Sequence, residues 1–154
     1  MYSAVLLLHS WFRWLVVIAG LLALVRALIG MSGGKPWTPG DAKGTLLFSI
    51  ALDIQFLLGL ILYAALSPIT RTAFSDMGNA MRNPVLRFWA VEHLVGMIVA
   101  IGLVHMGNRI IKRKSDAGSD RHRLAALFIG LAMVVIFFSM PWPWGANARP
   151  LFRF

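Results

Sequence analysis

Four long runs of apolar residues dominate this sequence. They extend over residues 3–31, 44–66, 87–111 and 124–140, with short polar segments between them. A helix that crosses a membrane needs about 20 predominantly apolar residues, so three runs are ample and the fourth is at the short end of the range. Lipid offers no hydrogen-bond partners, and a backbone inside it must bond within its own helix. The sequence predicts an all-α fold, a polytopic four-transmembrane-helix bundle that forms a single membrane domain over residues 1–154.

The composition excludes most classes of soluble protein. Hydrophobic residues make up 58% of the chain and charged residues only 14%, whereas soluble domains carry about 25% charged residues. A cytosolic globular enzyme, a disordered tail and a DNA-binding module are therefore excluded. The net charge of +9 comes mostly from the loops between apolar runs, so we expect no nucleic-acid partner. The absence of Cys excludes thiolate catalysis and Cys-ligated metal sites.

The ends of the predicted helices coincide with helix-breaking residues. The segment 32–40 is rich in Gly and Pro, and Thr38 or Asp41 could cap the second helix. The Ser-Pro pair at 67–68 ends the second helix, and the Asn-Pro pair at 83–84 begins the third. We therefore expect two helical hairpins joined by short loops.

The orientation follows from the distribution of Lys and Arg, which favour the cytoplasmic side. Four spans place both termini on one face, and that face carries fewer basic residues than the opposite one. We expect a bacterial inner-membrane protein with both termini periplasmic. The counts are nine on the inner face (Arg26, Lys35, Lys43, Arg109, Lys112, Arg113, Lys114, Arg121, Arg123) and five on the outer face (Arg71, Arg82, Arg87, Arg149, Arg153).

Two histidines are predicted to share one layer of the bundle. His9 and His93 each lie about 9 Å from the outer end of their helices, which run in the same direction. Two His at equal depth on facing helices is an arrangement that holds a haem b between axial ligands. We expect both residues to be metal ligands. The alternative is that each forms a polar contact between helices, for example His93 with Gln55 or His9 with a backbone carbonyl.

The neighbours of these histidines suit a haem. Arg13 lies one turn below His9, and Arg87 lies near the surface, where either could balance propionate charge. Gly96, three residues after His93, would let a porphyrin approach the backbone. Trp and Phe residues near both histidines would supply flat apolar walls, and we assign Arg13, Arg87 and Gly96 to cofactor binding.

A second polar cluster lies nearer the cytoplasmic face. Asp53 and Gln55 belong to the second helix and His105 to the third, at depths within about one helical turn. An Asp–His pair could relay a proton or bind a quinone carbonyl. The alternative is a buried structural hydrogen bond. Glu92 is expected to neutralise a charge, with Arg87 or Arg13 among its partners, and His122 to be a solvated residue at the membrane interface.

Several segments resemble a family of small four-helix bacterial membrane proteins labelled cytochrome b-like and common in Bacteroidetes-type genomes. The resemblance implies haem b and electron transfer, and His9, Gln55, Glu92 and His93 match its pattern. Asp53 stands where that pattern leads us to expect His, which argues against a ligand in the second helix. The matching segments are Leu8-His9-Ser10-Trp11, Lys35-Pro36-Trp37-Thr38, residues 55–63 (QFLLGLILY), residues 87–93 (RFWAVEH) and the Met-Pro-Trp-Pro that ends the fourth helix.

These observations lead to one expected function and one alternative. We expect an electron-transfer protein with one bis-His haem b near the outer face, which exchanges electrons with quinol or a partner. The alternative is a non-redox accessory or structural subunit of a larger respiratory or photosynthetic complex. Either protein would contact membrane lipid and other subunits or further copies of itself. The sequence contains no hydrolase or nucleotide-binding motif, so no catalytic residue is assigned.

Overall fold

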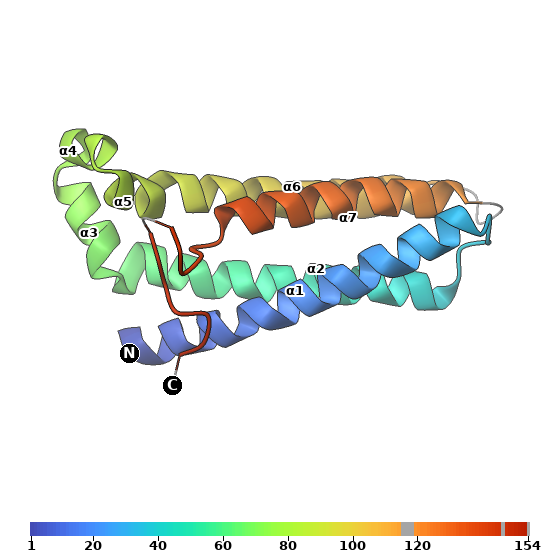
Figure 1. The fold of residues 1–154 in the computed structure, drawn as a ribbon, viewed down its shortest axis with the longest axis horizontal. Coiled ribbons are helices and arrows are strands. Elements are labelled where there is room, and N and C mark those ends of the chain that lie inside the picture. The colour runs from blue at the N-terminus through green and yellow to red at the C-terminus, as the bar shows by residue number, and fades with distance from the viewer. Residues whose placement is uncertain (115–118, 146, 154) are drawn as a thin grey trace.

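The computed structural model describes residues 1–114, 119–145 and 147–153. In this part of the chain, four helical segments are long and apolar enough to cross a membrane, which confirms the predicted all-α four-helix fold. The helix α1 packs on α2 and α7, and α7 packs on α6 (Figure 1). The four long helices are α1 (Tyr2–Ser32), α2 (Pro39–Ile61), α6 (His93–Ile111) and α7 (Asp120–Ser139).

The second helix begins earlier than its apolar run because of a capping box. The hydroxyl of Thr38 accepts a hydrogen bond from the backbone N–H of Asp41 at 3.3 Å, and Oδ2 of Asp41 accepts one from the N–H of Thr38 at 2.9 Å. These bonds satisfy two backbone donors that the first turn leaves without partners. The helix therefore starts at Pro39 instead of the predicted residue 44, and Thr38 is its cap.

The second and third spans each contain a π-helical turn near the end of the bundle that carries the termini. The helix α2 continues into η1 (Leu62–Leu66), and the third span runs from α5 (Pro84–Arg87) through η2 (Phe88–Glu92) into α6. Asn83 caps this span, because its Oδ1 accepts a hydrogen bond from the N–H of Val85 at 3.0 Å. The predicted start at the 83–84 pair is thus correct, and the third helical segment is three residues longer than its apolar run.

Two short helices were not predicted. They are α3 (Pro68–Ser75) and α4 (Met77–Arg82), and they cover the end of the bundle between the second and third spans (Figure 1). Their caps are Ser67, whose hydroxyl accepts a hydrogen bond from the N–H of Thr70 at 3.4 Å, and Asp76, which accepts one from the N–H of Asn79 at 3.0 Å. The serine that ends the second span therefore also starts the next helix.

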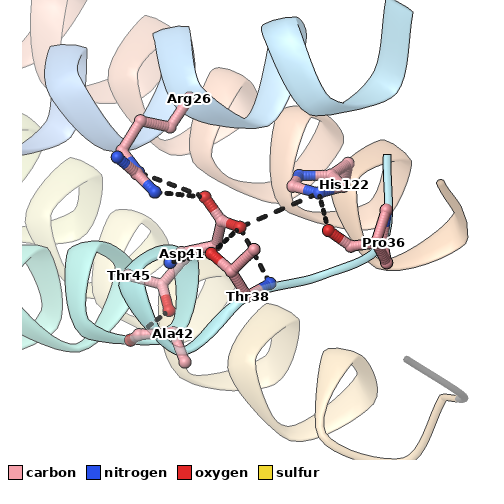
Figure 2. Close-up of polar contacts among 7 residues, drawn as sticks. All are labelled: Arg26, Pro36, Thr38, Asp41, Ala42, Thr45 and His122. Carbon is pink, nitrogen blue, oxygen red and sulfur yellow. Dashed lines mark hydrogen bonds and ion pairs between the residues drawn. The ribbon is translucent and has the colours of Figure 1, made fainter. Parts of the chain in front are cut away.

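At the opposite end, a polar network ties the first loop to α1 and α7 (Figure 2). Asp41 accepts hydrogen bonds from Nε and Nη2 of Arg26 at 3.1 and 2.9 Å. His122 of α7 lies beside the Arg26–Asp41 pair, and its Nε2 donates to the carbonyl of Pro36 at 3.4 Å. The expectation of a solvated His122 is wrong, because its side chain is 2% exposed. The ring packs on Trp37 and against the backbone of Gly30, where a Cβ would overlap it.

Small residues allow the long helices to approach one another. The core contains Phe48 and Leu52 of α2, and alanines face them from the other spans. Small side chains at helix contacts are typical of membrane bundles, in which close packing replaces the hydrophobic driving force. The alanines buried at these contacts are Ala23, Ala27, Ala100, Ala125 and Ala132.

Candidate functional site

A cavity opens at the end of the bundle that carries both termini. Its walls come from α1, from α2 with η1, from the start of α3, from η2 with α6, from the end of α7 and from the C-terminal segment. Its empty space totals about 1250 Å³ when the open side is included. None of the described residues that line the cavity is Asp or Glu, so a charged side chain in its wall can only be positive. The lining residues with ring or guanidinium nitrogens are His9, Arg13, Trp89, His93, Arg149 and Arg153.

His9 and His93 lie together in this cavity. Their ring centroids are 6.4 Å apart and the ring planes are nearly perpendicular, at 79°. Two imidazoles that bind one metal ion from opposite sides have centroids about 6 Å apart, because metal–nitrogen bonds are about 2 Å long. The two residues predicted to share a layer are thus brought to a spacing at which one metal centre could contact both.

The hydrogen bond of His93 determines its tautomer. Nδ1 lies 2.7 Å from the carbonyl oxygen of Ser139. A backbone carbonyl only accepts hydrogen bonds, so Nδ1 carries the proton and Nε2 keeps its lone pair. Metal-binding histidines usually donate their other ring N–H to a carbonyl or carboxylate in this way. His93 also packs against Phe88 and Trp89, whose ring centroids are 5.8 and 5.6 Å away.

His9 is held differently, by the amide of Gln55. Nε2 of Gln55 lies 3.1 Å from the backbone carbonyl of His9 and 3.3 Å from Nε2 of its ring. An amide NH₂ only donates, so the ring Nε2 accepts and Nδ1 carries the proton. Gly59 faces the same ring, where a Cβ would come within 3.2 Å of it. An interhelical contact of the alternative kind is therefore present, but Gln55 bonds to His9 and not to His93, and His93 is the one that bonds to a backbone carbonyl.

Buried polar atoms without partners gather around the cavity. Four side chains that line it have a buried nitrogen or oxygen with no hydrogen bond to any described residue. Such atoms are costly to bury and usually indicate a ligand, an ion or water. Three of the four carry N–H groups, so a molecule with acceptor oxygens would satisfy most of them. The atoms are Nδ1 of His9, Nε of Arg13, Oε1 of Gln55 and Nε1 of Trp89.

The C-terminal segment crosses α1 beside the cavity (Figure 1). The carbonyl of Leu151 accepts hydrogen bonds from Nη2 of Arg13 at 2.6 Å and from Nε1 of Trp14 at 3.0 Å. Phe152 stacks on Trp14 with ring centroids 5.3 Å apart. This segment brings Arg149 and Arg153 into the cavity wall, a role that the sequence analysis did not predict. The only signal was the mixture of Arg and aromatic residues after the last helix.

Two residues expected at the cofactor lie elsewhere. Nε of Arg87 is 2.6 Å from Oε1 of Glu92, and Arg87 is absent from the cavity wall. This pairing confirms one of the expected partners of Glu92. Gly96 packs against the side chain of Ser139 on α7 and is also absent from the wall. Of the three residues assigned to support a cofactor, Arg13 alone contributes to the cavity.

The predicted cluster of Asp53, Gln55 and His105 is split. Nε2 of His105 lies 2.8 Å from Oδ1 of Asp53, as expected from their depths. Their side chains are 53% and 42% exposed, so the pair lies on the outer surface of the bundle and is no buried structural bond. Gln55 points to the cavity instead, because two residues along a helix correspond to a rotation of about 200°.

The described residues contain no group of three or more His, Asp or Glu side chains that could hold a metal ion by themselves. A metal centre at His9 and His93 would need further ligands from a cofactor ring. Comparisons with protein-family models, with curated proteins and with solved structures find no match to this chain.

Proposed function

We propose that this chain is a cytochrome b-like electron-transfer protein that binds one haem b in the cavity near its termini. The observation that carries the proposal is the hydrogen bond from Nδ1 of His93 to the carbonyl of Ser139, at 2.7 Å. It leaves Nε2 of His93 unprotonated, and this residue lines the cavity 6.4 Å from the ring of His9. Both properties are required of an axial haem ligand.

The remaining lining suits a flat, apolar molecule with acidic groups at one edge. When bound, haem supplies one-electron redox chemistry. His93 and His9 would hold its iron, and Arg13, Arg149 and Arg153 would pair with its propionates. Trp89 adds an apolar wall and an N–H without a partner. The donor set of the cavity therefore fits this cofactor.

Gln55 has to release the ring of His9 for His9 to bind iron. Its amide contacts both Nε2 and the backbone carbonyl of His9. The bond to the carbonyl can persist while the bond to the ring is exchanged for a bond to metal. Gln55 would therefore hold α1 against α2 in either state, and its role would be to position His9.

We propose a location and partners for the protein as well. The excess of Lys and Arg in the loops opposite the termini favours a bacterial inner membrane with the haem on the periplasmic side. There the protein would exchange electrons with quinol or with a neighbouring subunit.

A reduced-minus-oxidised absorption spectrum tests the proposal. The chain would be expressed with ample haem and purified in mild detergent, together with His9→Ala and His93→Ala. His105→Ala is the matched control, because His105 lies on the outer surface and outside the cavity. We expect a sharp b-type α-band in the wild type and the control, and its loss in His93→Ala. A flat wild-type spectrum, or one that His93→Ala leaves unchanged, would contradict the proposal.

The hydrogen bonds at both histidines also favour a second candidate function. His9 is bonded to Gln55 and His93 to Ser139, so each ring connects two helices without any cofactor. In that case the chain would be an accessory subunit of a larger membrane complex. The two candidates differ in the spectrum above, and co-purification of other subunits with a haem-free chain would support the second.

A further inference from the structure

A hydrogen-bonded pair of ionisable side chains lies on the outer surface of the bundle, within its membrane-spanning part. Asp53 is at the midpoint of the span Pro39–Leu66, and His105 is about 9 Å before the end of α6. Oδ1 of Asp53 and Nε2 of His105 are 2.8 Å apart, and both side chains are about half exposed. Such groups within a membrane are costly and almost always face protein or water. We therefore expect something other than lipid to cover them.

The pair belongs to a set of surface residues on two helices that we call the α2/α6 face. This face consists of Leu46, Ile50, Asp53 and Leu57 on α2 and of Val95, Ile98, Gly102 and His105 on α6. The members on each helix are three to four residues apart, so they share one side of it. All five apolar members are at least 45% exposed. A Cβ added to the glycine in this face would meet nothing within 4 Å. The α2/α6 face is therefore a mostly apolar surface with one open glycine and one acid–base pair.

We propose that a second copy of this chain covers the α2/α6 face in a two-fold symmetric dimer. A two-fold axis along the membrane normal preserves the depth of every residue. It would therefore bring the Asp53–His105 pair of one copy to the depth of the same pair in the other. Each copy presents both an acid and a base, so the face is complementary in charge to itself, as a two-fold contact requires.

The shape of the face agrees with this occupant. Gly102 lies one turn from His105 and leaves the backbone of α6 open. A small residue beside a polar group is the combination that brings transmembrane helices together, because it permits close packing and a hydrogen bond at one point. The contact lies away from the cavity walls, so it is independent of the proposed haem.

Disulfide cross-linking in membranes tests the dimer directly. The sequence contains no Cys, so one introduced Cys is unique. Gly102→Cys places it in the α2/α6 face in open space, and Leu131→Cys is the matched control, since Leu131 is 45% exposed on α7 at a similar depth. With a mild oxidant we expect most of the Gly102→Cys chain to become a covalent dimer, and little of the control. Equal yields, or no dimer from Gly102→Cys, would overturn the proposal.

Two double substitutions, one that removes the pair and one that exchanges its members, test the role of the pair. In the Gly102→Cys background, replacing both Asp53 and His105 by Leu should lower the cross-linking yield at low protein density in liposomes by about threefold or more, because one interhelical hydrogen bond has roughly that effect. Exchanging the two residues, as Asp53→His with His105→Asp, keeps the face self-complementary and should retain the wild-type yield. If the Leu variant cross-links as well as the wild type, the pair does not hold the dimer and the proposal is wrong.

Discussion

Arg87 and Glu92 form an ion pair across five residues of one helix, with Nε and Oε1 only 2.6 Å apart. In a regular α-helix, side chains three or four residues apart are neighbours and those five apart are not. The π-helical turn η2 joins these two positions, and its wider i→i+5 spacing places Glu92 below Arg87. This ion pair, which the geometry of a regular α-helix would not favour, is thus produced by a local change in helix type.

The first prediction concerns the strength of this pair. Both side chains are nearly half exposed, at 44% and 46%, and exposed ion pairs contribute about 0–1 kcal/mol. We expect Glu92→Gln to lower the free energy of unfolding by less than about 1 kcal/mol, as measured by unfolding in detergent. A loss well above that value would mean that a partner excludes solvent from the pair.

A second prediction concerns the contact between Gly30 and His122. A Cβ at Gly30 would overlap the buried imidazole, so Gly30→Ala should destabilise the bundle by about 1–3 kcal/mol. Gly130→Ala is the matched control: it adds the same methyl group to a helix where the nearest heavy atom is Cδ1 of Leu24 at 3.8 Å, an ordinary contact, and it should be neutral or slightly stabilising. Thermal unfolding in detergent measures both. Similar melting temperatures for the two variants would contradict the close packing of His122.

The capping box of α2 gives a third prediction. Thr38→Ala removes the acceptor for the N–H of Asp41 and frees Asp41 from its 2.6 Å hydrogen bond with the Thr38 hydroxyl. The expected loss is about 0.5–2 kcal/mol. Thr72→Ala, at an exposed hydroxyl that bonds only to the carbonyl of Pro68, should have a smaller effect. Equal losses in the two variants would show that the box adds nothing to α2.

A fourth prediction concerns the C-terminal segment. Phe152→Ala removes the stacking on Trp14, and aromatic pairs contribute about 0.5–1.5 kcal/mol. The segment should separate from α1 more often, so its backbone amides should exchange hydrogen faster in a mass-spectrometric measurement. Phe138→Ala provides a control, because Phe138 is 77% exposed on α7. Unchanged exchange in Phe152→Ala would mean that the hydrogen bonds from Trp11, Arg13 and Trp14 are enough to fix the segment.

The long helices could be predicted because their signal is redundant. Twenty or more apolar residues in a row leave few alternatives in lipid, and helix-breaking residues mark the ends. The same reasoning placed His9 with His93 and Asp53 with His105, since depth along a straight helix follows from residue counting. Depth is thus the coordinate that a membrane sequence reveals best.

Rotation around each helix and the path of the irregular segments were harder to predict. Arg87 was expected at the cofactor, but the π turn directs it to Glu92. His122 was expected in solvent because its sequence neighbours are basic, and the fold of the first loop buries it. Arg149 and Arg153 line the cavity because of the path of the C-terminal segment. That segment has no helical or strand periodicity from which the position of its side chains could be predicted.

The hydrogen bonds between the C-terminal segment and α1 join positions 11–14 to positions 151–153. The C-terminal segment therefore returns to α1, and these two segments, which are far apart in the sequence, are neighbours in space. Such a topology does not depend on where the polypeptide is interrupted. A circularly permuted gene that joins the C-terminal segment to α1 through a short linker and opens the chain between Gly33 and Gly34 should yield the same bundle, with its new ends at the opposite end of the bundle.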